Sequence, residues 1–213
     1  MVESDFARFD GVIGSETELA ELIGTPPPKV VDKVIDRLDD ICRAFIARSP
    51  FCIIATATPG THIDVSPRGD PAGFVTVLDD RHVAIPDRPG NRRVDTFRNI
   101  LADPHVGLIF LVPGKGETLR LRGEGRIVRD EALRRSMAVD GKVPALALVV
   151  RVDEAFVHCP KAFIRSGLWD TNTWPQTDTL PDIGRAMIRH AGLDQSPDDL
   201  FAEATAEGLT TLY

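Results

Sequence analysis

The sequence predicts a mainly β fold, an antiparallel barrel with flanking helices, on three observations. Between residues 51 and 152, short apolar and β-branched runs alternate with tight turns. The long crossover connections that neighbouring parallel strands require are missing from this region. Helical periodicity is found chiefly before residue 50 and after residue 159. Together these observations favour a barrel over a parallel α/β sheet.

The expected strands follow one another closely along the chain. They cover residues 51–58, 62–66, 74–78, 82–86, 106–112, 117–129 and 145–152. The first two are joined by a hairpin-type turn at Pro59-Gly60-Thr61, and Pro113 to Gly116 forms a second turn. Residues 67–73 are expected to form an irregular loop.

The expected helices flank and interrupt the barrel. Ser15 to Glu18 has the spacing of a capping box, and Gly24 sits where that helix would end. The apolar period then predicts one continuous helix over residues 30–46. Further helices are expected over residues 91–102, 130–140, 182–191 and 197–207. The chain is thereby divided into an extension (1–28), a barrel domain (29–170) and a helical tail (171–213) that packs on the barrel.

Composition excludes several classes of protein. The 213 residues contain 25 Lys and Arg against 32 Asp and Glu, a net charge of −7, which argues against a nucleic-acid or anionic-membrane binder. No apolar run approaches the roughly 20 residues of a membrane span, and the acidic start does not resemble a secretory signal. The three cysteines (Cys42, Cys52 and Cys159) lack the spacing of a disulfide framework or zinc site. We therefore expect a cytoplasmic protein with no metal centre.

The densest positive cluster runs from Asp87 to Arg93 and opens the helix expected over residues 91–102. Helix N-termini attract anions, and Asn91 is a good N-cap. Arg92 and Arg93 could close on a phosphate with their forked donors. The same residues also fit an ordinary solvated helix start.

Two further segments could contribute to a site. Ser66 to Asp70 and the basic cluster flank the same hairpin, so both could approach one ligand, although a plain surface turn is the alternative. Lys161 and Arg165 are four residues apart on one side of a helical turn, and Trp169 offers an aromatic surface nearby. His158 and Cys159 fit structural roles better than nucleophilic catalysis, since no third orienting group is identifiable. Glycine-rich phosphate loops of the Rossmann and Walker types are absent from the sequence.

Taken in order, these segments resemble the pyridoxamine 5′-phosphate oxidase-like superfamily, the FMN-binding split β-barrels, over roughly residues 35–170. The sharpest part of the resemblance runs from Val83 to Phe110. There, Gly90 to Arg93 takes the place of a Gly-Ser-Arg-Lys phosphate loop, and Asp103 to Phe110 that of an Asn-Pro-x-Val-x-Leu-x-Phe strand. Together with Ser66 to Asp70 and Cys159 to Trp169, these segments most resemble a bacterial branch of uncharacterised flavoproteins.

The resemblance implies a homodimer with FMN at the interface. Arg92 and Arg93 would neutralise the phosphate, and Arg165 and Trp169 would cover the ring from the partner subunit. Thr118 takes the place of a Gln that reaches the flavin; it is shorter, and Arg120 is a candidate substitute. The residues expected to line the rest of the cofactor are Ser66, Arg68, Val75, Thr76, Pro86, Asp87 and Asn91.

The resemblance also implies an FMN-dependent oxidoreductase acting on an unknown small substrate. The candidate catalytic or substrate-binding residues are Arg68, near the reactive face, and Lys161 and Arg165, for an anionic substrate. The Arg-x-His-x-Arg-type motif with which true pyridoxamine phosphate oxidases bind their substrate is missing after residue 170, so the vitamin B6 substrate is not expected. The alternatives are a non-catalytic flavin, deazaflavin or haem carrier or sensor, and a structural dimer that has lost its ligand.

Overall fold

The computed structural model describes residues 6–58 and 62–213, so the turn expected at Pro59-Gly60-Thr61 lies outside the described residues. The chain divides into two compact units, Met1–Val34 and Ile35–Tyr213. The division into an extension, a barrel domain and a tail at residues 28 and 170 stays a prediction. In the described part of the chain, no helix is both long and apolar enough to cross a bilayer.

In the described part of the first unit lie the short helices α2 (Glu16–Ile23) and α3 (Pro28–Val31), and neither has a buried residue. The capping box expected at the start of α2 is confirmed, because the hydroxyl of Ser15 accepts the main-chain N–H of Glu18 at 3.2 Å. The carboxylate of Glu18 accepts the main-chain N–H of Gly14, the residue before the N-cap, at 3.1 Å. The helix ends at Gly24, as expected from its freedom to adopt a positive φ, here 78°.

The continuous helix expected over residues 30–46 is wrong. The second unit begins with an extended residue, Ile35, which exchanges two main-chain hydrogen bonds with Ala155 of the last strand at 3.0 and 2.7 Å. Helix α4 (Asp40–Ile46) then starts afresh, and Asp39 caps it by accepting an N–H of its first turn. A long-range strand contact therefore interrupts a helical period that is regular in the sequence.

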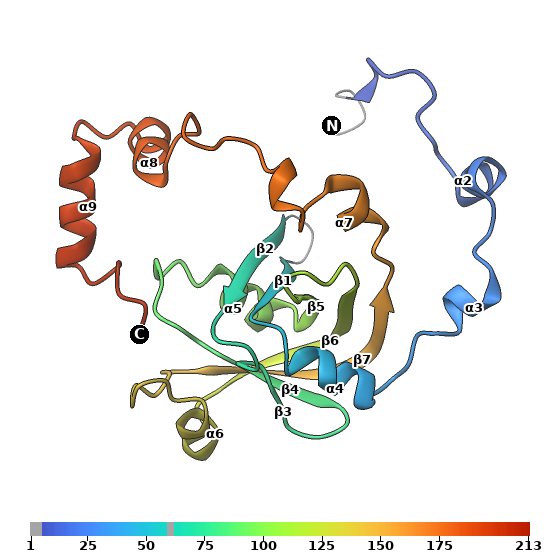
Figure 1. Ribbon diagram of the computed structural model, residues 1–213, viewed down its shortest axis with the longest axis horizontal. Coiled ribbons are helices and arrows are strands. Elements are labelled where there is room, and N and C mark those ends of the chain that lie inside the picture. Colours follow the sequence, from blue (N-terminus) through green and yellow to red (C-terminus); the bar gives the residue numbers. More distant parts are fainter. Residues whose placement is uncertain (1–5, 59–61) are drawn as a thin grey trace. The chain divides into compact units, whose positions relative to one another are not determined.

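Seven strands form one sheet in which every neighbouring pair is antiparallel (Figure 1). This confirms the mainly β, antiparallel fold with flanking helices. The order of the strands across the sheet is β2-β1-β5-β6-β7-β4-β3. Their bounds are β1 (Phe51–Thr58), β2 (His62–Gly69), β3 (Thr76–Val77), β4 (His82–Pro86), β5 (His105–Leu111), β6 (Thr118–Val128) and β7 (Ala147–His158).

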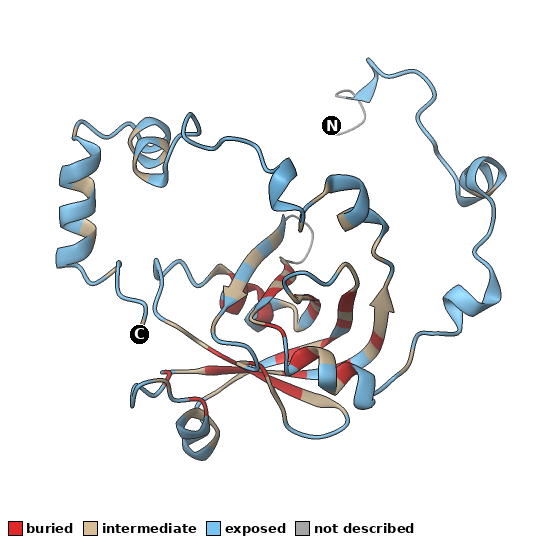
Figure 2. Cartoon of the chain, viewed as in Figure 1, coloured by how far each residue is buried: buried red, intermediate tan, exposed pale blue. Residues whose placement is uncertain are grey.

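The sheet curls around a single main core. Cys52 and Ile54 of β1 share one apolar cluster with Val83 of β4 and Val75 just before β3, although these strands lie near opposite ends of the sheet. Along β1, buried residues alternate with less buried ones, as expected for a strand with one face on the core. The buried residues in Figure 2 accordingly gather on the strands and on the helices beside them.

Strand β2 continues to Gly69, beyond the start of the loop expected at residue 67. Pro67 is tolerated there because β2 lies at the edge of the sheet, where a missing N–H removes no ladder bond to a second neighbour. This extension places Arg68 in the same strand as Ser66.

The remaining helices are short. Their bounds are α5 (Asp95–Ala102), α6 (Glu131–Ser136), α7 (Lys161–Ser166), α8 (Ile183–Ala191) and α9 (Pro197–Ala206). The two helices expected near residues 182–191 and 197–207 are confirmed. Side chains cap both of them, since Asp182 and Ser196 each accept a main-chain N–H from the first turn.

Candidate functional site

A pocket of about 630 Å³ lies between β2, the end of β4 and the connection from β4 into α5. This volume is within the range of roughly 300–1,000 Å³ that small-molecule sites occupy. The predicted site residues that line the pocket are Ser66, Arg68, Pro86, Asp87, Asn91, Arg92 and Arg93. The two loops that flank one hairpin in the sequence thus meet at one cavity.

Strand pairing directs the polar side chains of β2 into this pocket. Arg68 lies opposite Cys52, a fully buried core residue, so both side chains are on the inner face of the sheet. Asp64 and Ser66 share that face because strand residues alternate. The carboxylate of Asp64 accepts from the hydroxyl of Ser66 at 3.2 Å and from that of Thr96 at 3.3 Å, which fixes it between β2 and α5.

Arg68 is loosely held in the pocket. Its Nη1 lies 3.9 Å from the nearest carboxylate oxygen of Asp87, and its guanidinium carbon lies 5.7 Å from the centre of the Phe97 ring. Burial raises the pKa of the Asp87 carboxyl, and the charge of Arg68 opposes that rise. The cation therefore faces an acid that is itself poorly solvated, and it remains available to an incoming anion.

The positive cluster from Asp87 to Arg93, here called the basic loop, is not the start of a helix, contrary to the expectation from the sequence. Helix α5 begins at Asp95, and its N-cap residue is Val94, with a φ of 52°. Asn91 instead accepts the main-chain N–H of Arg93 with its side-chain oxygen at 3.1 Å. Arg92 also has a positive φ, 59°. Two non-glycine residues in the left-handed region bend this loop sharply, a strain that is often found at functional sites.

The arginines of the pocket differ in their partners. Arg93 donates to the carboxylate of Asp95 at 2.6 Å, whereas Arg92 donates to the main-chain oxygen of Glu207 at 3.0 Å. Among the described residues, Arg92 has no carboxylate partner within 4.0 Å. Arg88 is held by the buried carboxylate of Asp70. The cation most open to an external anion is therefore Arg92.

Several predicted site residues lie elsewhere. Val75 is only 3% exposed and belongs to the main core, and Thr76 is half-buried in the short strand β3. Thr118 is buried at the start of β6. None of the three lines the pocket.

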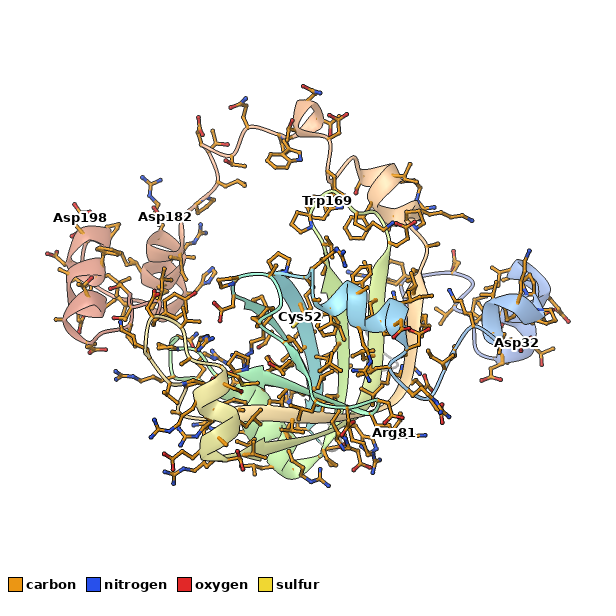
Figure 3. All side chains as sticks on the ribbon, turned by 60° about the horizontal axis from the view of Figure 1, so that its bottom comes forward. Asp32, Cys52, Arg81, Trp169, Asp182 and Asp198 are labelled. Atoms are coloured by element: carbon orange, nitrogen blue, oxygen red, sulfur yellow. The ribbon has the colours of Figure 1, made fainter. Side chains whose placement is uncertain are left out.

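Trp169 and the cations of α7 also lie outside the pocket lining. Lys161 and Arg165 are exposed on α7. Trp169 follows that helix (Figure 3), donates its indole N–H to the main-chain oxygen of Lys115 at 2.9 Å, and stacks on the ring of Phe163 at 5.6 Å. The expectation that Arg165 and Trp169 reach a cofactor from a partner subunit stays a prediction.

Part of the pocket is formed by residues that were not predicted from the sequence. Asp64, Phe74 and Phe97 line it together with the predicted residues. The alternation of residues 62–69 would have placed Asp64 beside Ser66 and Arg68, had Pro67 been interpreted as part of an edge strand. No local signal indicates Phe74 or Phe97, because only the folded sheet brings them to the cavity.

The fold is an antiparallel β sheet with flanking helices, and its pocket is lined, among the described residues, by four arginines and three aspartates. Residues 38–159 match the family model described as pyridoxamine 5′-phosphate oxidase, and this match covers more than half of the chain. The protein therefore belongs to the pyridoxamine 5′-phosphate oxidase family. No curated protein sequence matches the chain.

Solved structures resemble the chain over little more than half of its length. HupZ from Group A Streptococcus is 16% identical and has a TM-score of 0.47, covering 56% of this chain and 92% of its own. A protein related to general stress protein 26 from Clostridium acetobutylicum, of the pyridoxinephosphate oxidase family, is 14% identical with a TM-score of 0.40, covering 55% and 84%. An FAD-binding protein from Mesorhizobium loti is 16% identical with a TM-score of 0.41, covering 59% and 99%.

Proposed function

We propose that the pocket between β2, β4 and α5 binds FMN and that the protein is an FMN-dependent oxidoreductase acting on a small substrate. The observation that carries this proposal is the convergence of Arg68, Arg92 and Arg93 on one pocket within the segment that matches the family. Asp64, Asp87 and Asp95 also line the pocket, and Arg92 is the arginine whose only recorded hydrogen bond among the described residues goes to a main-chain oxygen, which leaves its charge for an anion.

The residues present fit a flavin phosphate. A phosphate dianion needs several donors, and forked guanidinium groups supply them in pairs. Arg92 would hold the phosphate together with Arg93, which would share its donors between the phosphate and Asp95. The strained loop that carries both arginines would present its side chains toward the cavity rather than along a helix axis.

The other lining residues would orient the remainder of the cofactor. Arg68 would place a positive charge beside the ring system, with the carboxylate of Asp87 3.9 Å from its guanidinium. Phe74 and Phe97 supply the apolar wall that a flat ring requires. Bound FMN would supply the hydride-transfer chemistry, so the protein needs few acid or base groups of its own.

We further propose that two copies associate through the outer face of the sheet and share the cofactor site. The register of β2, β1 and β5 sets Phe51, Ile53, Ile63, Val65 and Ile109 on that face. Ile63 is 79% exposed and Val65 is 60% exposed. Contiguous exposed apolar side chains of this kind mark interaction surfaces. A second copy of the same surface would cover both in a two-fold interface.

Arg120 supports the same arrangement. Arg120 lies on β6, opposite Ile109 of β5, and its guanidinium carbon is 5.9 Å from the centre of the Phe156 ring. Its Nε is buried and has no hydrogen-bond partner in the part of the chain that the structure describes. Because such a donor is costly to leave unpaired, we expect an acceptor from the partner subunit or from the shared cofactor.

The test is FMN binding by the purified full chain and by the Arg92→Ala/Arg93→Ala variant. We expect the wild type to bind FMN and the double variant to lose several-fold to a hundred-fold in affinity, or about 1 to 3 kcal/mol. The control is Arg98→Ala, which removes one positive charge from a 70% exposed position outside the pocket lining and should bind FMN normally.

The outcomes separate the parts of the proposal. Normal flavin content in the double variant would contradict the phosphate site. A protein that takes up haem but no flavin would instead favour a carrier or sensor. A monomeric mass by light scattering at micromolar concentration would rule out the shared site.

A further inference from the structure

The carboxylate of Asp70, directly after β2, is buried, with its side chain only 1% exposed. Both of its oxygens are used. One accepts from Nε of Arg88, and the other accepts the phenol O–H of Tyr213 at 2.6 Å. Tyr213 is the sole tyrosine of the sequence and lies far along the chain from both partners. A buried charge therefore depends on a residue of the C-terminal segment for half of its hydrogen bonding.

Arg88 contacts three groups, namely Asp70, Met137 and the ring of Tyr213. Besides Asp70, it donates to the main-chain oxygen of Met137 at 2.9 Å, at the end of α6. Its guanidinium carbon lies 5.6 Å from the centre of the Tyr213 ring. The amino group of Lys142 donates to the main-chain oxygen of Tyr213 at 2.8 Å, which gives the tyrosine a second hydrogen bond to the barrel domain.

Residues 207–213 make a second contact with the basic loop. The main-chain oxygen of Glu207, at the C-terminal end of α9, accepts from Arg92. The end of a helix carries a partial negative charge, which favours a guanidinium there. Arg88 and Arg92 are four residues apart and both line the 630 Å³ pocket.

The segment does not fill the pocket whose arginines it contacts. None of residues 207–213 lines the 630 Å³ pocket, whereas Tyr213 lines a neighbouring cavity of about 250 Å³ that shares Arg88 with it. A guanidinium has five donors, so Arg92 can keep its bond to Glu207 while it binds an anion. The contacts therefore support the pocket from outside and do not compete for it.

We propose that residues 207–213 form a strap that holds the basic loop in its binding conformation, with Tyr213 as a positioning residue that acts on Arg88 through Asp70. Ligand affinity then depends on docking of the strap, because a loosened loop must be ordered again at each binding event. The strap depends on the proposed function only for the identity of the anion that the loop binds.

The first measurement compares FMN and riboflavin, which differ by the phosphate, in wild type, Tyr213→Phe and Leu212→Ala. Tyr213→Phe removes only the hydroxyl that Asp70 accepts, and Leu212 is 78% exposed and serves as the control. We expect Tyr213→Phe to weaken FMN binding about ten-fold, or about 1.4 kcal/mol, and to leave riboflavin binding within two-fold. Equal losses for both ligands, or no loss for FMN, would overturn the proposal.

The second measurement needs no ligand. Hydrogen exchange of the peptide spanning residues 88–94 is compared among the same three proteins without FMN. Faster exchange in Tyr213→Phe and not in Leu212→Ala supports the strap, even if the wild type binds no flavin and the proposed function fails. Unchanged exchange in Tyr213→Phe overturns the strap, whatever the outcome for FMN.

Discussion

Gly123 is the position where the structure makes the sharpest prediction about stability. It lies at a register shift in the pairing of β6 with β7. A Cβ atom placed there would meet the main-chain oxygen of Arg151 at 1.8 Å, whereas ordinary contacts begin at 3.4 Å. Strand β7 cannot easily retreat, because Val152 donates to the main-chain oxygen of Arg81 at 2.7 Å on its other side.

Gly123→Ala should therefore force β7 away from β6 or from β4. Overpacking costs about 1–3 kcal/mol, and the loss of one or two ladder hydrogen bonds adds about 0.5–1.5 kcal/mol each. We expect a loss of about 3 to 5 kcal/mol in the free energy of unfolding, which lowers the melting temperature of a chain of this size by roughly 10 °C. Urea and thermal unfolding followed by circular dichroism measure both quantities.

Gly107→Ala is the matched control, since a Cβ there would meet nothing closer than the Cβ of Ala55 at 3.9 Å. It lies in the same sheet and should change the free energy of unfolding by less than about 1 kcal/mol. If the free energies of unfolding of the two variants differ by less than about 1 kcal/mol, β6 and β7 do not approach as closely at the register shift as described here.

Two further predictions concern ionisable groups. Burial raises the pKa values of the Cys42 and Cys52 thiols to about 12, whereas Cys159 is exposed, so a thiol reagent at pH 8 should label one cysteine in the native protein and three after unfolding. Rapid labelling of a second thiol in the native state would contradict the assigned core. The raised pKa of Asp87 means that the folded state binds this proton more tightly than the unfolded chain, so its contribution to stability falls as the pH rises from the ordinary value of 3.8 through the raised pKa. Asp87→Asn should therefore gain stability relative to wild type as the pH rises through that range, measured by denaturant titrations at several pH values, and a constant difference would refute the assignment.

Local patterns in the sequence predicted those parts of the fold that depend on neighbouring residues. The capping box of α2 follows from the spacing of Ser15 and Glu18, and the strands of the sheet follow from alternation and turn residues. The basic loop was found in the same way, because its arginines are adjacent in the chain. These signals are readable since the interactions behind them span only a few residues.

The tertiary structure decided whatever depends on contacts between distant segments. The helix expected over residues 30–46 is interrupted because Ile35 pairs with Ala155, a contact that no local sequence pattern predicts. Asn91 is not the N-cap, since Arg92 and Val94 adopt positive φ values and α5 begins only at Asp95.

The site itself shows the same division. The sequence by itself indicated the adjacent arginines Arg92 and Arg93 and the antiparallel arrangement of the strands. Only folding brought Asp64 and Phe97 to the same cavity and joined Asp70 to Tyr213. Strand pairing and side-chain packing are cooperative over the whole chain, so the partners of a buried charge are settled by the closed core and not by its neighbours in sequence.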